Sequence, residues 1–205
     1  MKTASAKAKL ILPALALAAA LCLASAEAPA LVAAKPMPPE AAKGSLESGV
    51  HFSLVDGDKK PVTEKSWPGK YQLVFFGFTH CPDICPVTLD KLSVALHKMG
   101  DETAAKVKVL FITTDPARDT PDVVKTYVEN VNKSITGLTG TEAQVKAAED
   151  VFKVYAVKND ADKNGDYSVD HSAFIYLMSP EGKMLEVIGA EAGANDIVDK
   201  VKGHL

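Results

Sequence analysis

The sequence predicts one α/β domain in which helices cover both faces of a mixed β-sheet. Apolar runs typical of buried strands alternate with segments typical of helices, and an antiparallel hairpin followed by a last helix closes the chain. With 205 residues, the chain is long enough for one domain with a substantial core. Its net charge of −3 offers no basic surface to nucleic acid or anionic membranes, so we expect neither as a partner.

The domain begins with a predicted N-terminal hairpin. His51–Val55 and Pro61–Thr63 flank the glycine-containing turn Asp56–Asp58. The next segment, Tyr71–Phe76, is almost entirely apolar, as is typical of a strand buried on both faces. We therefore expect it in the centre of the sheet.

A helix and a second buried strand follow. Apolar residues recur at spacings of three and four and form one stripe on a helix that ends at Gly100. These residues are Leu89, Leu92, Leu96 and Met99. The second strand is predicted at Val107–Thr114.

The next segments continue the alternation of helices and strands. Thr120-Pro121-Asp122 opens a helix, with the Thr120 hydroxyl as the N-cap and proline at the first helical position. Ile135–Leu138 is a short strand candidate, and a further helix runs from Thr141 to about Phe152.

The C-terminal part is predicted as a hairpin and a helix. His171–Met178 pairs with Met184–Ile188 through the turn Ser179–Lys183. A last helix begins at about Asn195.

The N-terminus has the three parts of a secretory signal peptide. Lysines precede the uncharged apolar run Leu10–Leu23, and Ala24–Ala26 suits a cleavage site. We expect a signal peptide at 1–26, an Ala/Pro-rich linker at 27–46 and the domain at 47–205. The leader contains no arginine, which disfavours a mitochondrial presequence and favours a periplasmic location. Membrane association is expected only if the leader is retained.

Cys81 and Cys85 stand between the predicted central strand and its helix, as in a thioredoxin-like three-layer domain. We expect both on the first helical turn, where residues four apart share a face. Their sulfurs can then form a disulfide or share a metal. Helix N-termini favour the thiolate, and two soft thiolates favour Cu(I) or Zn(II).

His171 is the strongest candidate for a third ligand, because it begins a strand that we expect inside the sheet, near the cysteines. The alternative is a histidine hydrogen-bonded at a loop edge. Asp170 is a candidate hydrogen-bond acceptor for this ring, and Asp83 a candidate for a supporting or partner contact. Asp115 is expected either to pair with Arg118, the only arginine, or to contact the site or a partner.

The loop that begins at Asp160 imitates the start of a calcium-binding EF-hand loop. Its twelfth position, which should be glutamate, is His171. We therefore expect a polar turn and no calcium.

Three motifs together resemble the Sco/SenC family: Phe76–Pro86, Thr114–Pro121 and Asp166–Phe174. The resemblance implies a thioredoxin-like fold with an added hairpin, and a copper site in which Cys81, Cys85 and His171 match the family's ligands. Two thiolates and one imidazole suit Cu(I) and, with an open position, can also tolerate Cu(II). Such proteins are copper chaperones that assemble the binuclear copper centre of cytochrome c oxidase subunit II. Many members keep a transmembrane helix, whereas this leader looks cleavable.

Two functions remain as alternatives. The first is a metallochaperone without catalytic turnover. The second is a thiol-disulfide oxidoreductase that reduces the cysteines of that copper site or of another exported partner, with Cys81 as the attacking thiolate and Cys85 as the resolving one. Three residues separate the cysteines, where thioredoxins have two, and no proline occurs from Asn159 to Ser179, where thioredoxins place a cis-proline. A peroxiredoxin-like peroxidase is a weaker third hypothesis.

Overall fold

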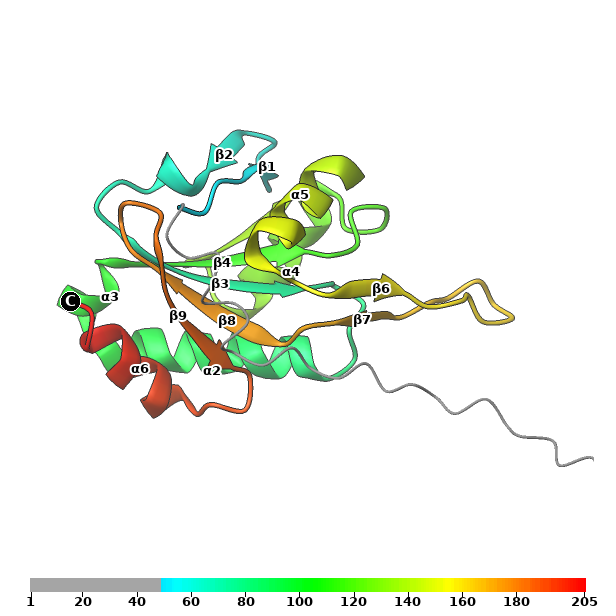
Figure 1. The fold of residues 1–205 in the computed structure, drawn as a ribbon. Helices are drawn as coiled ribbons and strands as arrows, with labels where there is room; N and C mark the ends of the chain where they lie inside the picture. Colours follow the sequence, from blue (N-terminus) through cyan, green and yellow to red (C-terminus); the bar gives the residue numbers. More distant parts are fainter. Residues whose placement is uncertain (1–48) are drawn as a thin grey trace, which may run out of the picture. The chain divides into compact units, whose positions relative to one another are not determined.

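A computed structural model describes residues 49–205, which form the predicted α/β domain (Figure 1). The predicted signal peptide, the linker and residues 47–48 lie outside the described residues. None of the described helices is both long and apolar enough to span a bilayer.

Seven strands form one mixed sheet in the order β2-β1-β5-β4-β3-β8-β9. The three central strands β3, β4 and β5 are parallel, whereas β1 and β8 are antiparallel to their central neighbours. The strands of this sheet are β1 (Ser53–Asp56), β2 (Pro61–Thr63), β3 (Tyr71–Gly77), β4 (Val107–Thr113), β5 (Ile135–Thr139), β8 (Phe174–Met178) and β9 (Met184–Gly189).

Helices cover both faces of the sheet and make the domain three layers deep (Figure 1). In β3, Leu73 and Phe75 join the core cluster with α2, α4 and α6, whereas Val74 and Phe76 join the cluster with α5. The predicted thioredoxin-like layering is confirmed. The helices are α2 (Ile84–Met99), α3 (Asp101–Ala104), α4 (Pro121–Val131), α5 (Glu142–Phe152) and α6 (Ala194–Lys202), with a 3-10 turn, η2 (Glu64–Ser66).

The predicted helix starts and ends are mostly confirmed. The apolar stripe of α2 is buried, and the helix gives way at Gly100, whose positive φ of 76° favours glycine. In α5, the Thr141 hydroxyl accepts the Gln144 N–H, and the Gln144 side chain accepts the Thr141 N–H. The prediction of a capping hydroxyl at Thr120 is wrong, because this side chain makes no cap hydrogen bond although α4 does begin at Pro121.

The prediction of one strand over His171–Met178 is also wrong. The segment is divided: β7 (Val169–His171) ends where His171 was expected to begin a strand, and β8 begins at Phe174. The Ser172 N–H donates to the Tyr155 carbonyl, while the Ala173 carbonyl accepts from the Ala190 N–H, so the chain changes partners between the two strands. His171 therefore lies outside the seven-stranded sheet.

β7 pairs with β6 (Ala156–Lys158) in a separate two-stranded ribbon that projects from the domain (Figure 1). The polar loop 159–168 joins the two strands. Its Asp162 carboxylate accepts the N–H groups of Asn164 and Asp166, which is the geometry of a polar turn. The ribbon brings His171 to the end of β3, beside the cysteines.

Candidate metal centre

The cysteines lie where β3 passes into α2. Cys85 is on the first turn of α2, but Cys81 lies in the preceding loop, so the prediction of both cysteines on the helix is wrong. The Cys81 N–H donates to the Phe78 carbonyl at 3.2 Å, which folds the chain into a turn before the helix begins. This turn still brings Cys81 back toward Cys85.

Gly77, the last residue of β3, leaves room for the Cys85 sulfur. A Cβ atom at this position would lie 2.6 Å from Cys85 Sγ and 2.9 Å from Cε2 of Phe111. Both distances are shorter than van der Waals contact, so a larger residue would displace the sulfur or the ring. A glycine at the end of a buried strand was the available sequence signal for this close approach.

The structure brings Cys81, Cys85 and His171 together. Their nearest donor atoms, two sulfurs and one imidazole nitrogen, all lie within 4.8 Å of one another. The Cys85 Sγ is 3.4 Å from His171 Nε2. Cys85 is fully buried, while Cys81 and His171 are half-buried, so the group lies at the surface with one sulfur inside the core.

The two cysteines have opposite pKa shifts. The pKa of Cys81 is lowered to about 5, chiefly by the hydrogen bond from the Cys85 thiol and further by the backbone N–H groups of Asp83 and Cys85. The pKa of Cys85 is raised, because its proton is held by Cys81 and because the side chain is buried. The pair therefore holds one half-buried thiolate and one buried thiol.

Local contacts orient the His171 ring. Its Nδ1 is 3.1 Å from the Ser172 carbonyl oxygen. Since a carbonyl only accepts, Nδ1 carries the proton and Nε2 presents a lone pair toward the sulfurs. Two aromatic rings contact the imidazole in T-shaped geometry, with centroids 6.3 Å away for Phe75 and 5.9 Å away for Phe78.

Asp119 fixes the loop that carries Cys81. Its carboxylate is fully buried and accepts hydrogen bonds from the Thr79 N–H, the Thr79 hydroxyl and the Thr113 hydroxyl. His80 is exposed beside this contact, 3.2 Å from the Thr79 hydroxyl, and lies outside the cysteine and histidine group. Sequence reasoning did not single out Asp119, because nothing in its motif distinguishes a buried carboxylate from an exposed one.

The three aspartates proposed from the sequence occupy different positions. Asp83 is the exposed N-cap residue of α2, and its side chain makes no cap hydrogen bond. Asp115 is buried and pairs with Arg118, as one of the two expectations for it required. Asp170 is exposed and pairs across the ribbon with Val157, so it faces away from His171, whose ring uses the Ser172 carbonyl as its acceptor instead. A partner contact by any of these aspartates stays a prediction.

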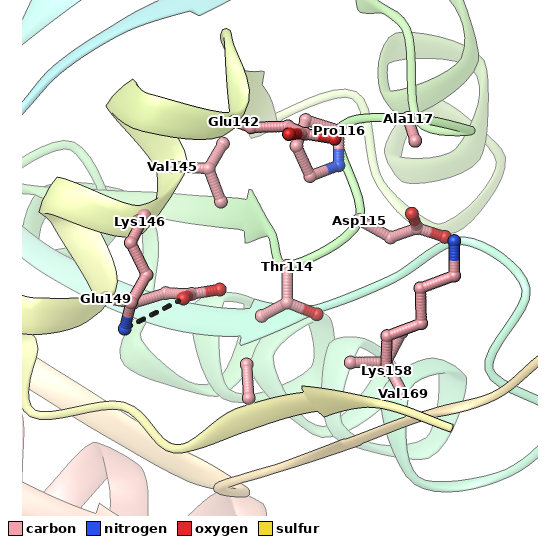
Figure 2. Close-up of a pocket in the computed structure, with 11 residues that line it drawn as sticks. Thr114, Asp115, Pro116, Ala117, Glu142, Val145, Lys146, Glu149, Lys158 and Val169 are labelled. Carbon is pink, nitrogen blue, oxygen red and sulfur yellow. Dashed lines mark ion pairs between the residues drawn. The ribbon is translucent and has the colours of Figure 1, made fainter. Parts of the chain in front are cut away.

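A separate cavity of about 350 Å³ lies between α5, the loop 114–117 and the ribbon (Figure 2). Lys158 and Asp115 lie at one side of this cavity, and Glu149 lies at the other, ion-paired with Lys146. The cavity does not include the cysteines or His171.

The donor set suits a soft metal ion. Two sulfurs and one neutral imidazole nitrogen are ligands that Cu(I) and Zn(II) prefer over hard cations. Three donors leave a coordination position open to an incoming ligand. The same sulfurs can instead form a disulfide, because one is a thiolate and the other is close by.

Comparison with known proteins agrees with this chemistry. The SCO1/SenC family model matches residues 40–205. The mitochondrial SCO2 protein of Saccharomyces cerevisiae is 42% identical over 165 residues, covering 80% of this chain but 55% of that protein. The chain thus spans little more than half the length of this curated relative.

Solved structures show the same fold. ScoI of Arabidopsis thaliana, determined with copper bound, has a TM-score of 0.70 and 41% identity, covering 75% of this chain and 96% of that one. BsSco, described as having a disulfide switch and as a member of the Sco family of cytochrome c oxidase assembly proteins, has a TM-score of 0.58 and 27% identity, covering 76% of this chain and 92% of that one. The chain belongs to the SCO1/SenC family.

Proposed function

We propose that this protein is an exported copper chaperone that binds one copper ion through Cys81, Cys85 and His171. It delivers the ion to the binuclear copper site of cytochrome c oxidase subunit II, or helps to assemble that site. The observation that carries this proposal is the convergence of two sulfurs and one imidazole nitrogen within 4.8 Å in a chain of this family. A relative of the same fold was determined with copper bound.

The geometry supports transfer as well as binding. Cys81 and His171 are half-buried, so an acceptor's ligands can approach the ion from the solvent side. A three-coordinate ion accepts one such ligand before it releases its own, and copper then passes between proteins without becoming free. Thiolates and imidazole are suitable ligands for Cu(I). The imidazole nitrogen and an open coordination position allow Cu(II) to bind as well.

The test is the copper stoichiometry of the fully reduced protein, measured separately for Cu(I) and Cu(II), with His171→Ala as the comparison. We expect one ion per chain, and loss or strong weakening of Cu(II) binding in the variant. His97→Ala, on the exposed side of α2, is the matched control and should bind as the parent does. Copper retention unaffected by His171→Ala would remove the histidine from the site and with it the chaperone proposal.

A thiol-disulfide oxidoreductase is the second candidate, and the asymmetry of the cysteine pair favours it. The Cys81 thiolate attacks one sulfur of a partner's disulfide and releases the other as a thiolate. Cys85, after losing its proton, then attacks Cys81 in the mixed disulfide and frees the partner's second thiolate. The partner gains two electrons, and Cys81 and Cys85 end as a disulfide. Incubation of the reduced, metal-free protein with an oxidised copper-site fragment of subunit II, followed by counting the thiols of each protein separately, separates this reaction from copper transfer, because two thiols move from one protein to the other.

The location and partners belong to the same proposal. The leader supports export, and a periplasmic or periplasm-facing position would place the site beside the exposed copper-binding domain of an oxidase. N-terminal sequencing of the mature protein tests cleavage after Ala26.

A further inference from the structure

The ribbon that carries His171 depends on side-chain contacts for its position. β6 and β7 pair only with each other, so the seven-stranded sheet does not hold them through a continuous ladder of hydrogen bonds. An isolated two-stranded ribbon is marginally stable in water. The distance from His171 to the cysteines therefore depends on what anchors β7, in addition to the two-residue link from His171 to β8.

Tyr167, two residues before β7 begins, joins the ribbon to the loop that carries Asp115 and Arg118. Its hydroxyl donates to Asp115 Oδ1 at 2.8 Å. The Arg118 guanidinium lies 3.6 Å from the centre of its ring, and the Lys158 ammonium also lies 3.6 Å from that centre. We call Tyr167, Arg118 and Asp115 the ribbon clamp.

Arg118 links the ribbon clamp to the metal centre. Its Nε donates to Asp115 Oδ2, which fixes the guanidinium under the Tyr167 ring. The same guanidinium lies 5.9 Å from the centre of the Phe78 ring, and the edge contact between Phe78 and His171 has a centroid distance of 5.9 Å. A continuous series of contacts thus runs from Tyr167 to the imidazole.

One short loop serves as the common support for ligands from both parts of the chain. Asp115 and Arg118 hold the ribbon that carries His171, whereas Asp119 holds the Thr79 segment that precedes Cys81. These residues lie within five positions of one another. The histidine and the first cysteine are therefore both held in place by the same loop. Buried carboxylates with several hydrogen bonds make this loop rigid.

The guanidinium is well suited to this position. It is planar and always charged, so it can stack flat on an aromatic ring, whereas a lysine ammonium contacts a ring only as a point charge. Its Nη2 is buried and makes no hydrogen bond within residues 49–205, so stacking and the single ion pair hold it. This is the chain's only arginine.

We propose that Tyr167, held by Arg118 and Asp115, is a positioning residue that places His171 opposite Cys81 and Cys85. This inference rests on the proposed copper site. When the ribbon clamp is broken, the ribbon moves and the imidazole is withdrawn, while both sulfurs remain. The expected consequence is a change from a site of two sulfurs and one nitrogen to a site of two sulfurs.

The test compares Tyr167→Ala with Tyr155→Ala. Tyr155 immediately precedes β6, is 47% exposed and lies outside the ribbon clamp, so it controls for loss of a tyrosine next to this element. We expect Tyr167→Ala to keep one Cu(I) per chain with affinity about 10- to 100-fold lower, the usual effect of removing a residue that supports a metal ligand. The nitrogen hyperfine signal of the Cu(II) form should disappear, and Tyr155→Ala should retain both properties.

A double variant tests whether Tyr167 acts through His171. If it does, Tyr167→Ala combined with His171→Ala binds copper no more weakly than His171→Ala alone. Additive losses, or a Tyr167→Ala protein with parental affinity and nitrogen signal, would overturn the inference.

A metal-free measurement separates failure of the inference from failure of the proposed function. In reduced, copper-free protein, NMR resonances of the His171 ring should shift and broaden in Tyr167→Ala and keep their parental positions in Tyr155→Ala. If the parent binds no copper, the proposed function fails while this measurement still decides the positioning role. If Tyr167→Ala does not fold, Tyr167→Phe takes its place, because it keeps the stacked ring and removes the hydrogen bond to Asp115. The His171 ring resonances should then shift in the same direction by a smaller amount. Unchanged ring resonances in Tyr167→Phe would refute the inference.

Discussion

Asp119 accepts hydrogen bonds from both donors of Thr79, its backbone N–H at 3.0 Å and its hydroxyl at 2.6 Å. Through this pair, a residue that contributes no metal ligand determines the path of the chain before Cys81. Replacing the carboxylate leaves buried donors without an acceptor, which costs about 1–3 kcal/mol for each unsatisfied group.

We therefore expect Asp119→Ala to lower the free energy of unfolding by about 2–4 kcal/mol, measured by urea denaturation of the reduced, metal-free protein. Asp122→Ala is the control, because its carboxylate is exposed and makes only a surface ion pair with Lys59 at 3.4 Å. Equal destabilisation by the two substitutions would contradict the role assigned to Asp119.

Gly77→Ala should destabilise the protein by overpacking. The added methyl group would meet Cys85 Sγ at 2.6 Å, and relief of such a clash usually costs about 1–3 kcal/mol. Thermal unfolding measures the loss. Gly203→Ala, where the nearest atom is an ordinary 3.4 Å away and φ is −66°, should change stability little. An unchanged melting temperature for Gly77→Ala would refute the close approach.

Cys81 should alkylate at unusually low pH. Its pKa of about 5 makes it a thiolate throughout the neutral range, so the rate of reaction with iodoacetamide should rise with pH to a plateau, with its midpoint near 5. Cys85 should remain unmodified, because it is buried and its pKa is raised. Mass spectrometry of the reduced, metal-free protein distinguishes the two sites.

The Cys85→Ala variant tests the cause of this shift. The hydrogen bond from Cys85 is the largest contribution, so its removal should move the Cys81 midpoint up toward the usual value of about 8.5. A midpoint that stays near 5 would assign the shift to the backbone N–H groups instead.

Glu149 should make the protein less stable as pH rises. Burial raises the pKa of this carboxyl to about 7 in the folded state, against 4.5 as its ordinary value. The folded protein therefore holds the proton more tightly than the unfolded chain, and the free energy of unfolding falls between about pH 4.5 and 7. Glu149→Gln should remove this decrease. Between pH 5 and pH 8, the free energy of unfolding of the parent should therefore fall by about 2 kcal/mol more than that of the variant.

Denaturation series at pH 5 and pH 8 measure this difference. Glu142→Gln, an exposed residue that lines the same cavity as Glu149, is the matched control (Figure 2). If the free energy of unfolding changes equally with pH in Glu149→Gln and in the parent, the buried carboxyl does not take up a proton.

The sequence predicted the core strands and helices in their order and the three side chains that converge, but not the separate ribbon of β6 and β7. The apolar runs at Tyr71–Phe76 and Val107–Thr114 identified strands buried on both faces, because such strands need no polar side. Cysteine chemistry limited the candidates for a soft-metal site. His171 was predicted as the third ligand from an expected place at the start of a strand inside the sheet; that place is wrong, because His171 ends β7, but the histidine does lie beside the cysteines. The resemblance to the Sco/SenC family implied the same residue.

The error at His171–Met178 has its physical origin in tertiary pairing. His171–Met178 is apolar enough for one strand, and nothing local shows that Ser172 bonds to Tyr155 and redirects the chain. Nor does the sequence show that Asp119 is buried or that Tyr167 stacks on Arg118, because both contacts join segments distant in sequence. Local patterns specify elements, whereas these contacts depend on how the elements are assembled.

The donors Cys85 and His171 lie 86 positions apart in the sequence. An ion that bridged them would act as a cross-link across a long loop, and closing such a loop restricts the unfolded chain far more than the folded one. Binding of the ion would then slow unfolding and protect the domain from proteases. Release of the ion would make the domain easier to unfold again. The lifetime of the protein would then indicate whether the ion is bound.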